Sequence, residues 1–100
     1  MRRAAKVDDT QEAIVKALRQ VGCKVLSMAA IGNGAPDLLV LVPGQGSWQE
    51  AVDALILLEV KNLDGRGAGL TPDQVKFHAQ WPVVVVTSPE EALKAAGVGI

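Results

Sequence analysis

The sequence predicts an α/β domain with a central mixed sheet flanked by helices, in the element order αβββαβα. Two unbroken apolar runs of strand length, Leu38–Val42 and Ala54–Val60, are typical of strands at the centre of a sheet, buried on both faces. Two other segments, which begin at Pro72 and Pro89, each follow a Thr or Ser in the pattern that starts a helix. Helices at the start and end of the chain can cover the two faces of such a sheet.

The composition fits one folded domain that spans residues 1–100, because 49% of the residues are hydrophobic and 21% are charged. The formal charge of -1 argues against binding nucleic acid through an overall basic surface. One Cys and one His cannot build a zinc site, and a single Cys fits a reducing cytoplasm, where we expect the protein. No segment approaches the roughly 20 apolar residues of a membrane span, so no membrane partner is expected.

The first element is expected to be a helix over residues 9–21. Apolar residues recur at helical spacing between Asp9 and Gly22, and Glu12 follows Asp9 by three residues, as in a capping box. Glycine then ends the helix.

A short strand over Lys24–Met28 and a turn over Ile31–Gly34 are expected next. The two apolar runs follow as the central strands. Their connection, from Pro43 to Asp53, is longer than a tight hairpin, and its shape is left open.

Near Thr71, a capping threonine, a proline at the first helical position and Gln74 at the capping-box position predict a helix to about Gln80. Four valines, Val83–Val86, form the last strand. A second capping pattern at Ser88 starts a final helix that runs to about residue 96.

Three charged residues lie at the ends of the two apolar strands. Asp37 stands directly before one strand, and Glu59 and Lys61 alternate around the end of the next. In an extended chain Glu59 and Lys61 project to the same face, so an acid from each neighbouring strand and one amine are expected to converge. A carboxylate in such apolar surroundings is costly unless it is paired or binds a cation.

Two carboxylates, a main-chain carbonyl and water form the oxygen environment that Mg²⁺ or Mn²⁺ requires, so one of these ions is the expected cofactor. Asp37, Glu59 and the carbonyl of Val60 are the expected metal ligands. Such an ion activates water for attack on a phosphate, and the Lys61 ammonium steadies the nucleophile or the charge that develops. This chemistry hydrolyses phosphodiester bonds.

The same residues carry a resemblance to a known family. Gly34–Val40 resembles the G-x-PD motif and Leu58–Lys61 the E-x-K motif of PD-(D/E)XK nucleases, which share a restriction-endonuclease-like αβββαβ core. The subgroup that the chain resembles most is VRR-NUC. Leu70–Phe77 is similar to the helix after E-x-K in that subgroup, and the opening helix follows its spacing, so the resemblance spans roughly residues 8–91.

The resemblance implies further site residues. It adds Gln74 to the catalytic set of Asp37, Glu59 and Lys61, although a capping-box role explains Gln74 equally well. For the first-helix residue that supports the metal, Gln11 fits the spacing and lies nearer the apolar face, while Glu12 has the charge; Asp8 is a third candidate. Independently of the resemblance, the expected contacts to nucleic acid come from Arg3, in a basic cluster at the start of the chain, and from Arg66 and Lys76, which surround the expected site.

The resemblance also implies a metal-dependent endonuclease that cuts DNA, with branched or Holliday-junction DNA as its substrate form and a homodimer as its working unit. The competing interpretation is a non-catalytic nucleic-acid-binding or assembly module that retains the fold. The low net charge favours it, and so does the last strand, which lacks the arginines that name the subgroup.

Overall fold

The computed structural model describes residues 3–44, 53–62 and 69–97, with side chains from residue 9 onward. The elements along the chain are α1 (Arg3–Gln20), β1 (Lys24–Ser27), β2 (Leu38–Val42), β3 (Ala54–Val60), α2 (Pro72–Gln80), β4 (Val83–Val86) and α3 (Pro89–Ala95). The predicted αβββαβα order is therefore confirmed. Within the described residues, no helix is long and apolar enough to cross a membrane.

The four strands form one mixed sheet in the order β1-β2-β3-β4. β2 is antiparallel to both of its neighbours, β1 and β3, and β4 runs parallel to β3. Leu38 of β2 faces Leu58 of β3, so the residue that precedes β2 lies level with Glu59. This register decides which side chains meet at the end of the sheet.

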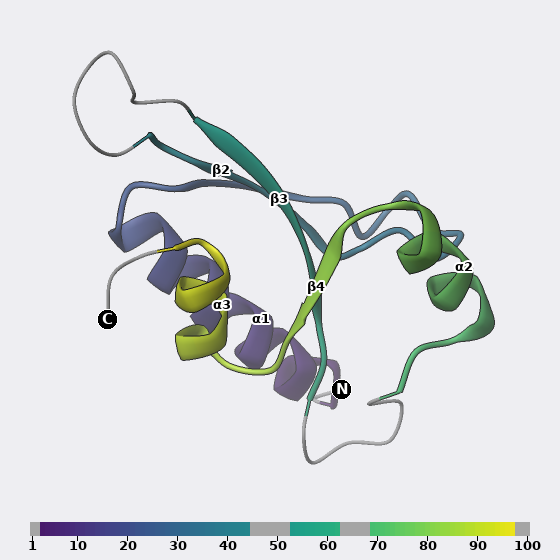
Figure 1. Cartoon of the computed structure of the whole chain (residues 1–100). Helices are drawn as coiled ribbons and strands as arrows, with labels where there is room; N and C mark the ends of the chain where they lie inside the picture. The colour runs from purple at the N-terminus through teal and green to yellow at the C-terminus, as the bar shows by residue number, and fades with distance from the viewer. Residues whose placement is uncertain (1–2, 45–52, 63–68, 98–100) are drawn as a thin grey trace.

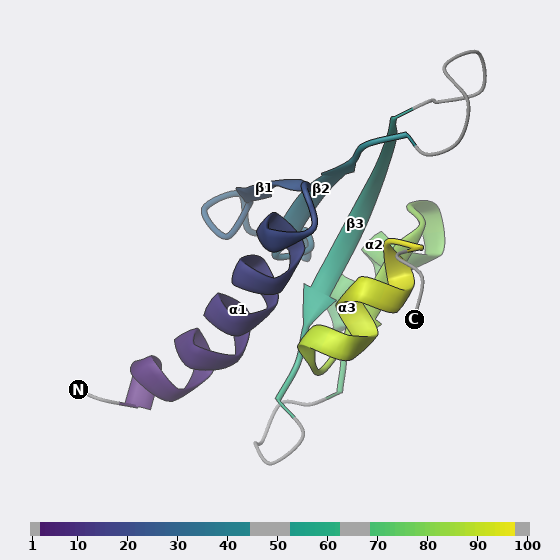
Figure 2. The ribbon, with the colours of Figure 1, turned by 90° about the vertical axis from the view of Figure 1, so that its left-hand side faces the viewer.

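The core lies between the sheet and the pair α1 and α3, which pack against each other on one face (Figures 1 and 2). Ile14 and Leu18, one turn apart on α1, are completely buried. They belong to one cluster with residues of β2, β3, β4 and α3, namely Leu38, Val40, Val42, Leu58, Val86 and Ala92.

The prediction that the central strands are buried on both faces is wrong. In β2 buried and half-buried residues alternate, and β3 begins with the exposed residues Ala54 and Leu55. The reason is the placement of the helices: α1 and α3 share one face, and among the described elements only α2 lies on the other (Figure 1). Within residues 3–44, 53–62 and 69–97, that second face is therefore covered at one end and open at the other.

The predicted start of the first helix is also wrong. The helix begins at Arg3 instead of residue 9, because Ala4 and Ala5, with the highest intrinsic helix propensity, extend it towards the N-terminus. Asp9 and Glu12 are consequently interior helix residues and not caps. The strand β1 ends at Ser27, one residue before the predicted end, and α3 ends at Ala95.

The helix α2 has the predicted bounds and the predicted cap. The Thr71 side chain accepts a hydrogen bond from the Gln74 backbone N–H, and the Gln74 side chain accepts one from the Thr71 backbone N–H. These two bonds satisfy amide groups that a helix start otherwise leaves unpaired. They also fix the first turn of α2, and with it the direction in which Gln74 points.

Candidate active site

The candidate site lies where β2 begins and β3 ends, on the face opposite α1 and α3. Asp37 immediately precedes β2, Glu59 is the second-to-last residue of β3, and Lys61 follows β3. Because β2 and β3 are antiparallel with Leu38 opposite Leu58, Asp37 and Glu59 lie on adjacent strands at the same level. The structure thus brings the three charged residues together.

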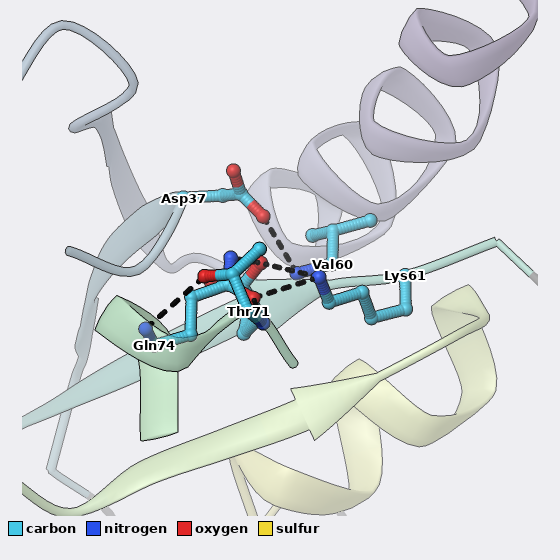
Figure 3. Close-up of polar contacts among 6 residues, drawn as sticks. Asp37, Val60, Lys61, Thr71 and Gln74 are labelled. Atoms are coloured by element: carbon cyan, nitrogen blue, oxygen red, sulfur yellow. Dashed lines mark hydrogen bonds and ion pairs between the residues drawn. The ribbon is translucent and has the colours of Figure 1, made fainter. Parts of the chain in front are cut away.

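Two sets of polar contacts hold these residues, one at Asp37 and one among Glu59, Lys61 and Gln74 (Figure 3). Asp37 Oδ2 accepts a hydrogen bond of 2.8 Å from the backbone N–H of Val60. The Lys61 ammonium donates to Gln74 Oε1 at 3.0 Å and lies 3.5 Å from Glu59 Oε2. Gln74 Nε2 donates to the same Glu59 oxygen at 2.9 Å. Gln74 therefore bridges the acid and the amine of the E-x-K segment.

Glu59 is the one charged residue among the buried side chains that the structure describes, with 3% of its surface exposed. Its Oε1 is buried and has no hydrogen-bond partner within the described part of the chain. The pKa of Glu59 is raised from 4.5 to about 7: burial is the largest cause, the nearby Asp37 carboxylate acts in the same direction, and Lys61 opposes both. An unpaired buried oxygen of this kind needs a cation or a proton.

This donor set fits a hard divalent ion. The unpartnered Oε1 of Glu59, the neighbouring Asp37 carboxylate and the main-chain carbonyl of Val60 offer oxygen ligands of the kind that Mg²⁺ and Mn²⁺ take. Within residues 9–44, 53–62 and 69–97, no three His, Cys, Asp or Glu side chains lie close enough together to hold a metal ion by themselves. A metal here would therefore complete its shell with the carbonyl and water.

The predicted first-helix residues stay apart from these contacts. Gln11 is half-buried and Glu12 is exposed, and no described hydrogen bond joins either to the acids. The side chains of Asp8 and Arg3, and the whole of Arg66, lie outside the described residues. The roles predicted for Asp8, Arg3 and Arg66 therefore stay predictions.

Lys76 lies on the exposed side of α2. It borders a shallow groove of about 230 Å³ that Asn33, Phe77 and Gln80 also line. The groove lies between the turn that precedes β2 and the outer side of α2. Lys76 thus stands where it can contact a ligand over α2, and no described ion pair links it to Asp37 or Glu59.

Two residues that the sequence did not single out connect the first helix to the site. Thr10 Oγ donates a hydrogen bond of 2.6 Å to the side-chain oxygen of Asn62, the residue after Lys61. The two positions are 52 residues apart in the chain. The bond ties α1 to the segment that carries the lysine.

We expect Thr10→Val to lower the free energy of unfolding by about 1 kcal/mol, because valine keeps the shape of threonine and leaves the Asn62 oxygen without its donor. Urea unfolding of Thr10→Val, Asn62→Ala and the double variant measures this. If the two single effects add fully in the double variant, the bond contributes nothing to stability.

Comparison with known proteins gives one match at the level of structure. No protein-family model matches the sequence. No curated protein matches it either. A solved structure described as a VRR_NUC domain superposes with a TM-score of 0.60 at 24% sequence identity, and the alignment covers 92% of this chain and 95% of that one. The resemblance indicated by the G-x-PD and E-x-K motifs is thus confirmed in the backbone, and the chain has the restriction-endonuclease-like fold of a VRR_NUC domain over almost its whole length.

Proposed function

We propose that this protein is an endonuclease that hydrolyses DNA phosphodiester bonds with Mg²⁺ or Mn²⁺. The observation that carries the proposal is the buried Glu59 carboxylate, which lies near a second acid, Asp37. Its Oε1 has no hydrogen-bond partner within the described residues, and its Oε2 is held by an ammonium and an amide. A purely structural carboxylate in this position would leave a buried oxygen unsatisfied at a cost of about 1–3 kcal/mol. The fold shared with a VRR_NUC domain supports the same reading.

In this proposal the chain's own residues have separate tasks. Asp37, Glu59 and the Val60 carbonyl hold the ion, and the Val60 N–H orients the Asp37 carboxylate. When bound, the ion supplies Lewis acidity and lowers the pKa of a coordinated water. Lys61 places a positive charge beside the carboxylates, where it stabilises charge that develops on the phosphate oxygens. Gln74 holds the Lys61 side chain in that direction.

For the substrate we propose branched DNA, cut by two copies of the chain acting together. A domain of this size covers little of a duplex, so two copies provide a longer binding face and one cut on each strand. The open part of the sheet face favours self-association, because Leu26 of β1 and Leu55 of β3 are 60% and 65% exposed there. Light scattering with and without DNA measures the oligomeric state, and a monomer in both conditions contradicts the paired mode of action.

The test of the activity uses labelled duplex, single-stranded and four-way-junction DNA with Mg²⁺, Mn²⁺ or EDTA. Wild type should cut with either ion and stop in EDTA, with the junction as the preferred substrate. Asp37→Asn should lose at least about 100-fold in rate, because the amide cannot serve as an anionic ligand. Asp73→Asn, at an exposed acid in the first turn of α2, is the matched control and should cut like wild type.

Wild-type protein that binds these DNAs without cutting any of them would contradict the proposed activity. That outcome would favour the competing interpretation, a binding or assembly module that retains the fold. Equal rates for Asp37→Asn and Asp73→Asn would remove the carboxylate pair from the mechanism.

A further inference from the structure

The helix α2 carries Gln74, yet hydrophobic packing does little to hold it. None of its nine residues is buried, and Val75 is 53% exposed. Its largest apolar side chain, Phe77, stacks on Trp81 at a centroid distance of 5.8 Å, and Trp81 is itself 53% exposed. The position of α2 over the sheet must therefore be set chiefly by contacts at its first turn, where it meets the site.

One of those contacts is a close approach between two backbones. Gly34, in the turn before β2, has a φ of +82°. A Cβ atom at this position would lie 2.9 Å from the Gln74 backbone nitrogen and closer still to the carbonyl group of Asp73. Such distances are far inside van der Waals contact, and main-chain atoms cannot rotate away as a flexible side chain can. Only a glycine lets the turn lie this close to α2.

The residue that this contact places is Gln74. Its backbone nitrogen is one of the atoms against Gly34, and its side chain donates to Glu59 at 2.9 Å and accepts from Lys61 at 3.0 Å. Hydrogen bonds of this kind weaken when donor and acceptor separate by a few tenths of an ångström beyond 3.2 Å. Moving α2 outward to admit a side chain at residue 34 would therefore break or lengthen both bonds.

The same turn leads into Asp37 only three residues later. This short segment thus positions Asp37, and it also positions α2. The Gln74 side chain of α2 in turn contacts Glu59 and Lys61. We infer that Gly34 is a positioning residue: its missing side chain sets the distance between the turn and α2, which places Gln74 in contact with Glu59 and Lys61. The consequence for catalysis rests on the proposed nuclease function, whereas the consequence for Gln74 does not.

The chain offers a matched control in the same turn. Gly32 also has a positive φ, +74°, but a Cβ atom there would meet nothing within 4 Å. Gly32→Ala and Gly34→Ala therefore share the backbone strain, and only Gly34→Ala adds the collision. Gly34→Asn adds the same Cβ with less backbone strain, since asparagine tolerates positive φ better than alanine, and it serves if Gly34→Ala does not fold.

Three readouts separate positioning from loss of stability. In nitrogen-15 spectra of the metal-free protein, the side-chain amide signals of Gln74, assigned with Gln74→Leu, should shift in the Gly34 variants and stay in place in Gly32→Ala. In DNA cleavage, the Gly34 variants should lose roughly tenfold or more in kcat with KM changed less than about twofold. The double variant Gly34→Ala and Gln74→Leu should lose no more kcat than Gln74→Leu alone, because both changes remove the same contacts.

Unchanged Gln74 signals in both Gly34 variants would overturn the inference, and so would equal effects from Gly32→Ala. Full additivity of Gly34→Ala and Gln74→Leu would also overturn it. If wild type cuts no DNA, the proposed function fails, and the amide signals still decide whether Gly34 places Gln74.

Discussion

Replacing Lys61 with methionine is expected to lower kcat for DNA cleavage by about 10²–10³-fold, the usual loss when one preorganised charge donor is removed from a site. Methionine keeps the unbranched stem of the side chain but removes the ammonium that lies 3.5 Å from Glu59 Oε2 and 3.0 Å from Gln74 Oε1. Because the ammonium also opposes the rise in the Glu59 pKa, its loss should raise that pKa further.

Single-turnover cleavage of junction DNA tests the expected loss in rate. Lys76→Met removes the same charge from the exposed side of α2 and is the control. It should weaken DNA binding modestly, in a salt-dependent way, without changing the single-turnover rate at saturating DNA. A Lys61→Met protein that is folded and as fast as Lys76→Met would exclude Lys61 from the chemistry.

The second large effect concerns stability. Burial holds the pKa of Glu59 at about 7, above its ordinary 4.5, so the folded state binds this proton more tightly than the unfolded state does. The contribution is therefore fully present below about pH 4.5 and is lost as the pH rises through about 7. Glutamine mimics the protonated carboxyl, so Glu59→Gln should stabilise the metal-free protein at pH 8 by about 1–3 kcal/mol and have little effect at pH 5.

Urea unfolding at pH 5 and pH 8, in EDTA and then in Mn²⁺, measures this difference. Mn²⁺ should stabilise wild type at pH 8 and leave Glu59→Gln unchanged, because the variant lacks an anionic ligand. Asp9→Asn, at an exposed position of α1, controls for a general change in net charge. If Glu59→Gln destabilises the protein at pH 8 in EDTA, the buried carboxylate is already satisfied without a metal, and Glu59 does not need a cation.

Local signals predicted those parts of the fold that local interactions determine. Thr71, Pro72 and Gln74 form a cap within four residues, and α2 has the predicted bounds. The apolar runs of β2, β3 and β4 also have theirs. The start of α1 was misjudged because a good capping residue, Asp9, competes with the stronger helix propensity of the alanines before it.

Features that depend on contacts between distant segments could not be predicted from one sequence. Whether a strand is covered on one face or two depends on where helices dock, and the apolar runs of β2 and β3 look the same in either case. The meeting of Asp37, Glu59 and Lys61 could be anticipated because strand periodicity and neighbouring strands bring them together. The bond from Thr10 to Asn62 could not, because nothing near either residue indicates a partner 52 positions away.

Val60 occupies the boundary between two environments. Its backbone N–H holds Asp37, its side chain packs against the hydrophobic cluster, and the next N–H, of Lys61, donates to Val86 of β4 at 3.0 Å. The position of the reactive groups therefore depends on the packing of the core. Loosening the packing of Val60 and Val86 would let the Asp37 and Glu59 carboxylates move apart, although no polar side chain had been replaced. Heating, or a substitution that leaves a small cavity in the core, should thus abolish activity before the protein unfolds.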